Sequence, residues 1–160
     1  MTNHFKIFDL AEQFSIDKNL LEEKYLQLQN QYHPDRNQNF QQLTIEQINQ
    51  SYQIINDDFL RACHLLQLKN IDILDDEKAI KPDHAVLLEA LDLQEQISEM
   101  TNKTAIENLQ KNLKQTINDL LLDFQQSFQE QQFHNSGQIL VKIKYFKKAL
   151  ENLKLKKSML

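Results

Sequence analysis

Apolar residues recur at helical spacing in two stretches of the first sixty positions. In the first stretch they follow one another at intervals of 4, 3 and 4 residues: Leu21, Tyr25, Leu28 and Tyr32. Such intervals place side chains on one face of an α-helix. Asp17 can cap the first turn, so the pattern predicts a helix that begins at Lys18. A second helical pattern begins near Phe40 and carries Leu43, Ile48, Tyr52 and Ile55.

The two patterns are joined by a loop over residues 33–39 and together predict an antiparallel helical hairpin. The segment 56–58, Asn-Asp-Asp, then interrupts the periodicity. A short helix should follow, with apolar positions at Phe59, Ala62, Leu65 and Leu66. Ahead of the hairpin, three aromatic residues are expected to pack across it: Phe5, Phe8 and Phe14.

Residues 68–83 lose this periodicity and predict a boundary between two domains. The segment contains the acidic cluster 75–77 and ends at Pro82, after which Asp83 can cap a new helix. The sequence therefore predicts an N-terminal domain over residues 1–75, a linker over 76–83 and a C-terminal domain over 84–160.

Three further helical patterns follow, over residues 84–100, 103–132 and 136–155. The second carries a long apolar series: Ile106, Leu109, Leu113, Ile117, Leu120, Phe124 and Phe128. Three consecutive amphipathic helices predict an antiparallel three-helix bundle. The fold class expected for the whole chain is all-α.

The first bundle helix has more apolar residues than one buried stripe requires. At 100° per residue, one face carries the expected core positions: Val86, Ala90, Leu93, Ile97 and Met100. Another side carries leucines bordered by acids: Leu87, Leu88, Leu91, Asp92, Glu95 and Glu99. We refer to this second set, together with Tyr145, as the leucine/acid patch. It is a candidate partner surface, unless the N-terminal domain covers it or the exposure is incidental.

The last bundle helix shows the same surplus. Its expected core stripe is Ile139, Ile143, Phe146, Leu150 and Leu153. Val141 and Tyr145 are predicted to point away from that stripe. An aromatic residue on the outer side of this helix could extend the surface formed by the first bundle helix.

Composition narrows the function classes. The net charge of −5 argues against a general nucleic-acid surface, since such surfaces need clustered Lys and Arg. The C-terminal lysines, at positions 142–157, are expected to form a solvated helix face that pairs with the acidic first bundle helix. No apolar run approaches the ~20 residues that span a bilayer, and the N-terminus lacks a targeting pattern. The cytoplasm is the expected compartment.

The cysteine and histidines also do not form the pattern of a disulfide, a metal site or a catalytic site. Cys63 is the single cysteine, so a disulfide within the chain and a Cys-x-x-Cys metal site are excluded. It precedes His64, but neighbours on a helix diverge by about 100° and would not converge on one ion. His4, His84 and His134 do not complete a metal-ligand pattern. We expect no metal, no cofactor and no enzymatic activity, because no residue is placed to activate Cys63 as a nucleophile.

The tripeptide His33-Pro34-Asp35 stands between the two helices of the predicted hairpin. Proline lacks an N–H and clashes with the preceding turn, so the first helix must end at or before His33. An imidazole and a carboxylate are thereby presented on a loop, where binding residues are often found.

The residues around this tripeptide resemble the J-domain of the HscB family, the dedicated co-chaperones of iron–sulfur cluster assembly. The resemblance rests on residues 5–10 (FKIFDL), 14–17 (FSID), 28–36 (LQNQYHPDR), 48–55 (INQSYQII) and 60–66 (LRACHLL). It continues into the first bundle helix at 87–95 (LLEALDLQE), so that it covers both domains. The second half distinguishes this family from general J-domain proteins.

The resemblance implies two partners. One is an HscA-type ATPase chaperone of the DnaK class, whose ATP hydrolysis would be accelerated by contacts at His33, Pro34 and Asp35, with Lys24 and Arg36 nearby. Asp35 would pair with a chaperone arginine. The other is an IscU-type scaffold, which would bind at Leu87, Leu88, Leu91, Asp92, Glu95, Glu99 and Tyr145. Helix geometry and family resemblance thus select the same patch.

Two departures from the family pattern bear on function. J-domains usually carry several basic residues on the helix before the tripeptide, whereas residues 20–32 offer only Lys24 against Glu22 and Glu23. Weak electrostatic steering towards the chaperone is therefore expected. The cysteine-rich zinc module of some members is also absent from this sequence.

Two function classes remain open at this stage. The first is an iron–sulfur co-chaperone that brings the scaffold to the chaperone. The second is a general J-domain co-chaperone whose bundle mediates self-association or binds unfolded clients. We expect a monomer, with a weak dimer left open.

Overall fold

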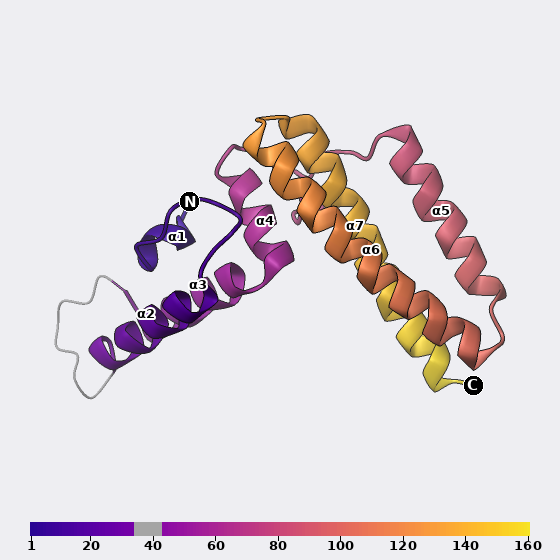
Figure 1. Cartoon of the computed structure of the whole chain (residues 1–160), viewed down its shortest axis with the longest axis horizontal. Coiled ribbons are helices and arrows are strands. Elements are labelled where there is room, and N and C mark those ends of the chain that lie inside the picture. The colour runs from indigo at the N-terminus through magenta and orange to yellow at the C-terminus, as the bar shows by residue number, and fades with distance from the viewer. Residues whose placement is uncertain (34–42) are drawn as a thin grey trace. The chain divides into compact units, whose positions relative to one another are not determined.

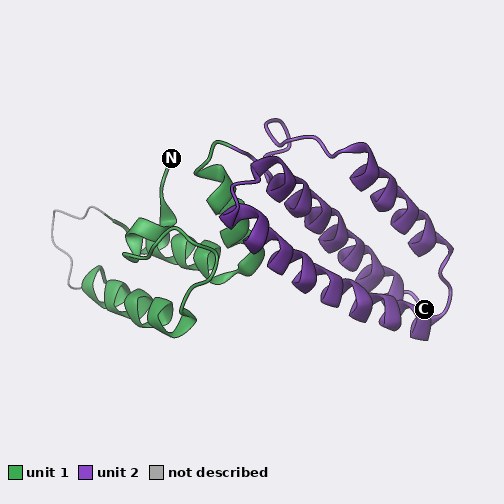
Figure 2. Ribbon diagram, turned by 45° about the horizontal axis from the view of Figure 1, so that its top comes forward, with its two compact units in different colours: residues 1–70 green, residues 71–160 purple. Residues whose placement is uncertain are grey.

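The computed structural model describes residues 1–33 and 43–160, and within these ranges it contains seven helices and no strand (Figure 1). The predicted all-α fold class, with an N-terminal helical hairpin flanked by short helices and a C-terminal three-helix bundle, is confirmed for the described residues. The chain forms two compact units, residues 1–70 and residues 71–160 (Figure 2). Among the helices in the described ranges, none is long and apolar enough to cross a membrane.

Unit 1 is built on a helical hairpin of α2 (Lys18–Gln31) and α3 (Ile45–Asn56). Asp17 caps α2 as predicted, because its carboxylate accepts hydrogen bonds from the N–H groups of Asn19 and Leu20 at 3.0 and 3.1 Å. The second helix begins later than the predicted Phe40, which lies outside the described residues. Thr44 forms a reciprocal capping box with Gln47, and this fixes the start of α3 at Ile45.

The hairpin is held together by apolar and aromatic contacts. Leu21 of α2 and Ile48 and Ile55 of α3 are fully buried. The rings of Tyr25 and Tyr52 are stacked across the two helices, with centroids 3.9 Å apart and planes 7° from parallel. Aromatic pairs of this kind contribute about 0.5–1.5 kcal/mol beyond their burial. The stack therefore fixes the register of α2 against α3.

Helix α1 (His4–Ile7) and helix α4 (Asp58–Gln67) complete unit 1. α4 places Arg61 at 3% exposure, where its guanidinium donates to the carbonyls of Phe14 and Ile55 and to the Asp58 carboxylate at 2.8, 2.7 and 2.9 Å. The guanidinium also lies over the Phe14 ring. Partial burial is the largest single effect and opposes ionisation of Asp58, but the hydrogen bonds and positive charges of Arg61 and Lys18 together outweigh it and lower the pKa of Asp58. A buried charge is thus fully compensated within unit 1.

Unit 2 contains the bundle of α5 (His84–Glu99), α6 (Lys103–Gln129) and α7 (Phe133–Ser158). Successive helices run in opposite directions, and α7 packs against both α5 and α6 (Figure 1). The bundle core is formed by apolar side chains from all three: Leu93, Ile97, Ile106, Leu113, Ile117, Leu121, Phe124, Leu140, Ile143, Phe146 and Leu153. The predicted stripes of α5 and α7 are only partly buried, since Val86, Ala90, Met100, Ile139 and Leu150 are half-buried.

Residues 71–83 lie along α7 within unit 2. Gln138 binds the C-terminal end of this segment twice, accepting from the Asp83 N–H at 2.7 Å and donating to the Lys81 carbonyl at 2.9 Å. The single glycine, Gly137, permits a close approach, since a Cβ there would lie 2.5 Å from Cδ1 of Ile80. Residues 71–83 therefore belong structurally with the bundle. The functional limits 1–75 and 84–160, with 76–83 between them, stay a prediction.

The packing of this segment coincides with one wrong prediction about α7. Val141 was predicted to point away from the core, but it is buried at 5% exposure. It lies one helical turn from both Gly137 and Lys144, and Lys144 donates from its Nζ to the carbonyl of buried Ile73 at 3.0 Å. This side of α7 is thus covered by the chain that precedes the bundle, a contact that helical periodicity alone does not reveal.

Candidate partner-binding surfaces

The first candidate surface lies at the C-terminal end of α2. The helix ends at Gln31, and its C-cap Tyr32 donates its N–H to the Leu28 carbonyl at 2.9 Å. The next residue, His33, is exposed. The other predicted loop residues, Pro34, Asp35 and Arg36, lie outside the described residues. The structure thus places His33 directly after a well-formed helix.

A polar cluster supports the last turns of α2. The Tyr25 hydroxyl donates to the Asn49 side-chain oxygen at 2.7 Å, and Gln29 donates to both of these groups at 2.7 and 3.1 Å. These bonds link α2 to α3 on the same side as the Tyr25–Tyr52 stack. The position of the helix that leads into His33 is therefore set by side chains of both hairpin helices.

Lys24, predicted to contact the chaperone, has a partner inside its own unit. Its Nζ donates to the carbonyl oxygen of Asp9 at 3.1 Å, just after α1, where Asp9 has a positive φ of 51°. Lys18, the other lysine of α2, pairs with Asp58 at 3.3 Å. Both basic groups of α2 are thus engaged in holding neighbouring segments of unit 1.

Two histidines that the sequence analysis treated only as metal-ligand candidates form a pair in unit 1. The backbone N–H of His4 donates to Nε2 of His64 at 3.0 Å, and Nδ1 of His4 lies 2.6 Å from the Ser51 hydroxyl. An imidazole nitrogen that accepts a backbone N–H must be unprotonated, so His64 is held neutral. Burial, with His64 as the second cause, lowers the pKa of His4 from 6.5 to about 4. Burial also lowers the pKa of His64.

This pair joins α1 to α4 and has a structural role. The rings of His4 and His64 lie 4.6 Å apart, and Phe5 stacks on His64. In the described part of the chain, no group of three or more His, Cys, Asp or Glu side chains could hold a metal ion. Cys63, which precedes His64, is buried.

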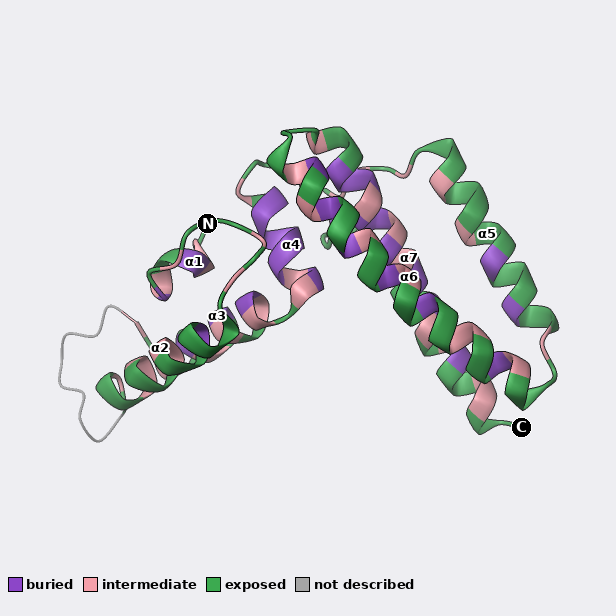
Figure 3. Ribbon diagram, in the orientation of Figure 1, coloured by how far each residue is buried: buried purple, intermediate pink, exposed green. Residues whose placement is uncertain are grey.

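The second candidate surface lies on α5. Leu87, Leu88 and Leu91 are 38, 47 and 50% exposed, whereas Leu93 and Ile97 on the same helix are buried. Most of α5 is coloured as exposed in Figure 3. Asp92, Glu95 and Glu99 are exposed as well. The helix therefore directs a narrow apolar stripe towards α7 and leaves its own residues of the leucine/acid patch in solvent.

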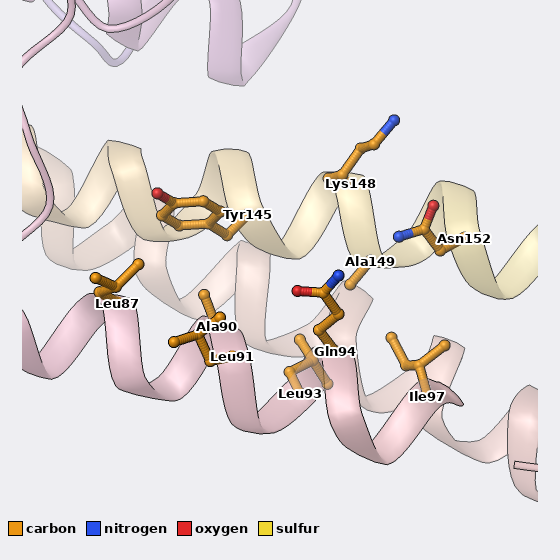
Figure 4. Close-up of a pocket in the computed structure, with 10 residues that line it drawn as sticks. All are labelled: Leu87, Ala90, Leu91, Leu93, Gln94, Ile97, Tyr145, Lys148, Ala149 and Asn152. Atoms are coloured by element: carbon orange, nitrogen blue, oxygen red, sulfur yellow. The ribbon is translucent and has the colours of Figure 1, made fainter. Parts of the chain in front are cut away.

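Part of the patch forms a groove between α5 and α7. The groove has a volume of about 260 Å³, and its walls include Leu87 and Leu91 from α5 and Tyr145 from α7 (Figure 4). Tyr145 is half-buried and lies across from Leu87 in this view. Tyr145 is thus brought together with Leu87 and Leu91, which precede it by more than fifty positions in the sequence.

The remaining patch residues lie outside this groove. Leu88, Glu95 and Glu99 do not line it, and Asp92 instead borders a second groove of about 300 Å³ between α5 and α6. Asp83, at the predicted cap position of α5, makes no side-chain capping bond; its carboxylate lies 3.0 Å from Nε2 of His134.

Several polar residues on the groove walls were not among the predicted patch residues: Gln94, Lys148 and Asn152. Helical spacing could have indicated them, because Gln94 follows Leu91 by three residues and Lys148 follows Tyr145 by three. Lys142, among the predicted pairing lysines, bonds Glu89 of α5 at 2.8 Å. Lys157 pairs instead with Glu107 of α6 at 3.1 Å.

Known proteins resemble this chain over most of its length. A co-chaperone protein HscB homolog of Acinetobacter baumannii (strain SDF) is 31% identical over 153 residues, which are 94% of this chain and 88% of that protein. Co-chaperone protein HscB of Proteus mirabilis is 33% identical over 114 residues, 67% of this chain and 65% of that protein. A family model described as the HSCB C-terminal oligomerisation domain matches residues 82–154.

Solved structures of co-chaperones also resemble this chain in fold. Human co-chaperone HscB superposes with a TM-score of 0.81 at 24% identity, over 100% of this chain and 84% of that chain, a likeness of fold. The Jac1 co-chaperone from Saccharomyces cerevisiae gives a TM-score of 0.79 at 27% identity, over 94% of this chain and 89% of that one. The fold, with its J-domain and helical bundle, is that of a J-domain co-chaperone. More specifically, the chain belongs to the HscB co-chaperone family.

Proposed function

We propose that this chain is a co-chaperone of iron–sulfur cluster assembly with two partners. Its His33-Pro34-Asp35 loop stimulates the ATPase of an HscA/DnaK-class chaperone. Its leucine/acid patch binds an IscU-type scaffold and brings it to that chaperone. The ATP chemistry belongs to the chaperone, and this chain is not itself an enzyme. It acts in the cytoplasm.

The exposed leucines of α5 carry the scaffold assignment. Burying apolar side chains at the centre of an interface stabilises a complex, and a polar rim adds specificity. Leu87, Leu91 and Tyr145 supply such a centre around one groove, while Asp92, Glu95 and Glu99 are exposed along the same helix. Unpaired acids at a rim favour a basic partner surface and raise the association rate.

The loop assignment rests on family membership and on the position of His33. An exposed imidazole directly after α2 can reach a partner without rearrangement of the hairpin. Asp35 would form a charge-assisted hydrogen bond to an arginine of the chaperone, a contact that is short and geometrically demanding. Pro34 would restrict the loop, and Arg36 would add a positive charge beside it.

A specific observation favours a second candidate function. The family model that matches residues 82–154 is described as an oligomerisation domain. The same exposed leucines could therefore mediate self-association in a general J-domain co-chaperone. Sedimentation analysis distinguishes the two functions: a wild-type dimer that becomes a monomer when Leu87 and Leu91 are changed to alanine supports the second one.

Scaffold affinity tests the patch. The variant Leu87→Ala/Leu91→Ala/Tyr145→Ala should weaken binding to the purified scaffold at least about tenfold in calorimetry, since central apolar residues dominate interface energies. The matched control is Leu122→Ala/Leu155→Ala, two leucines of α6 and α7 with 64 and 63% exposure outside the groove. Equal affinity of the patch variant and the control would contradict the assignment.

Steady-state ATP hydrolysis tests the loop. The chaperone is assayed alone, with the chain, with the scaffold, and with both added together. The chain should stimulate hydrolysis, and His33→Gln should abolish its contribution while leaving scaffold affinity unchanged. Stimulation by His33→Gln equal to that of the wild type would remove the loop from the proposed function.

A further inference from the structure

A second groove, between α5 and α6, lies on a different side of α5 from the groove that contains Tyr145. It has a volume of about 300 Å³, and we refer to it as the α5–α6 groove. Buried side chains form its apolar floor: Leu93, Leu113 and Phe146. Polar side chains from both helices form its rim: Glu89, Asp92, Gln96, Asn112 and Thr116. Of the rim residues only Asp92 belongs to the leucine/acid patch, and no residue of α6 does.

The chain itself shows what kind of group this groove accommodates. Lys142 of α7 places its Nζ 2.8 Å from the Glu89 carboxylate and 5.7 Å from the centre of the Phe146 ring. Both Glu89 and Phe146 line the groove. A cation is stabilised by a carboxylate beside it and by the face of an aromatic ring. One end of the groove is thus already satisfied by a basic side chain.

The rest of the rim offers acceptors that no cation satisfies. Asp92 follows Glu89 by three residues and Gln96 follows Asp92 by four, so all three lie on one side of α5. Asn112 and Thr116 lie one turn apart on α6, and the Thr116 hydroxyl donates to the Asn112 carbonyl at 2.9 Å. In the described part of the chain, the side chains of Asp92, Gln96 and Asn112 have no ion pair or hydrogen bond.

Acceptors distributed along a groove match a guanidinium better than an ammonium. A guanidinium is planar and donates five N–H groups in fixed directions, whereas an ammonium is a compact point charge. The methylene groups of an arginine would lie on the apolar floor while its charged end meets the rim. Asp92 would supply the opposite charge, and Gln96 and Asn112 would supply further oxygen acceptors.

We propose that the α5–α6 groove receives an arginine side chain of the scaffold. Continuity assigns the partner: at 100° per residue, Leu88 and Glu95 lie on α5 between the two grooves, so a surface that covers them reaches both. α6 therefore takes part in recognition through Asn112 and Thr116, which lie outside the leucine/acid patch. This inference rests on the proposed function and adds to it a second groove and the chemistry of one partner residue.

Calorimetry with the full-length chain and the purified scaffold measures the affinity that tests this site. Asn112→Lys places a cation in the groove and should weaken binding about tenfold, through repulsion of the arginine. Asp92→Asn removes the opposite charge and should weaken binding about three- to tenfold. Asn118→Lys is the matched control, since it makes the same change at an exposed position of α6 outside the groove and should leave the affinity unchanged.

Scaffold variants test whether the occupant is an arginine. Each surface arginine of the scaffold is changed in turn to lysine, which keeps the charge but loses the planar donor geometry. One of these changes should weaken binding to the wild-type chain about fivefold. The same change should cause no further loss with the Asn112→Lys chain, because that substitution has already broken the contact.

The outcomes separate the inference from the function on which it rests. A wild-type chain that does not bind the scaffold overturns both. Equal affinities of Asn112→Lys and Asn118→Lys, with binding still weakened in Leu87→Ala/Leu91→Ala/Tyr145→Ala, overturn the arginine site alone. Tighter binding by Asn112→Lys would mean that the groove receives an acidic group, and full additivity of that substitution with every scaffold arginine change would mean that it receives no arginine. Either result also overturns the inference. Far-UV circular dichroism of Asn112→Lys and Asp92→Asn should match the wild type, because both positions are exposed.

Discussion

Helices α4 and α5 use their side chains in opposite ways. α4 has ten residues, seven of which are buried, including Arg61 and His64. α5 has sixteen residues, of which only Leu93 and Ile97 are buried. α4 organises the core of unit 1 through polar contacts of its buried side chains. α5 instead packs on α7 along one narrow stripe and keeps three leucines in solvent. A helix that buries little of itself can offer most of its surface to a partner.

The largest expected effect tests the organising role of α4. Arg61→Ala should lower the free energy of unfolding of unit 1 by about 3–5 kcal/mol, because it removes a fully bonded buried guanidinium and leaves the carbonyls of Phe14 and Ile55 without their donor. Urea unfolding followed by tyrosine fluorescence in a Tyr145→Phe background reports unit 1 alone, because the other three of the four tyrosines lie there.

Arg61→Lys is the control that keeps the positive charge of Arg61 but removes the fixed donor geometry of its guanidinium. A lysine keeps the positive charge but cannot donate in three fixed directions, so an intermediate loss of stability is expected. An unfolding midpoint for Arg61→Ala equal to that of the wild type would mean that α4 does not depend on this residue. It would contradict the role of polar contacts that distinguishes α4 from α5.

A second prediction compares two leucines on α5 itself. Leu93→Ala removes a buried side chain and should cost about 2–3 kcal/mol, while Leu91→Ala, two residues earlier and half-exposed, should cost less than about 0.5 kcal/mol. Scaffold binding should follow the reverse order, with Leu91→Ala the more damaging change. Unfolding of unit 2 by circular dichroism and calorimetry with the scaffold measure the two effects. Equal effects of both substitutions on both quantities would contradict the division of α5 into a core side and a partner side.

The sequence predicted the elements of both regions but not the contacts that join distant segments. The helix start at Lys18, the short helix around Phe59 and the bundle all follow from periodicity and capping residues. The later start of α3 could also have been predicted, because Thr44 and Gln47 have capping-box spacing. The burial of Val141 and the pairing of His4 with His64 could not, since both depend on packing between segments tens of residues apart.

The candidate surfaces show the same limit. Helical geometry separated Leu87, Leu88 and Leu91 from the core stripe of α5, and the structure exposes all three. It could not show that Tyr145 lines the same groove as Leu87, since that depends on how α7 packs against α5. Nor could it show that Lys24 is bonded to Asp9, because the loop after α1 has no periodic pattern.

A third prediction uses acid to weaken unit 1 selectively. The lowered pKa values of His4 and His64 mean that the unfolded chain binds protons that the folded unit does not. Stability should therefore be intact above the unfolded value of 6.5 and should fall as the pH decreases towards about 4. With allowance for partial exposure, the loss should be about 1–2 kcal/mol.

Unfolding midpoints measured between these pH values in the Tyr145→Phe background test this prediction. His64→Gln should flatten the pH dependence, because glutamine keeps a hydrogen-bond acceptor near the His4 N–H without titrating. His84→Gln, at an exposed position of α5, should leave the dependence unchanged. A pH profile for His64→Gln as steep as that of the wild type would contradict the role assigned to the pair.

The smallest expected effect concerns how α5 is held at its C-terminal end. Lys156 of α7 donates from its Nζ to the carbonyls of Ile97 and Ser98, the latter at 2.8 Å. These carbonyls belong to the last turn of α5, where unpaired acceptors and the helix dipole both favour a cation. Lys156→Ala should therefore destabilise α5 by about 0.5–1 kcal/mol, and amide hydrogen exchange in residues 94–99 should quicken about two- to fivefold.

Lys154→Ala is the matched control, because Lys154 is exposed on the same helix and should leave exchange in α5 unchanged. The expected increase should be confined to α5 and absent from α4, whose buried contacts do not involve Lys156. Faster exchange in α4 and α5 alike would mean that the substitution acts on the whole chain rather than on one attachment. Faster exchange in α5 alone, with weaker scaffold binding, would show that the leucine/acid patch depends on this attachment: α5 buries too little of itself to keep its position without partners on α7.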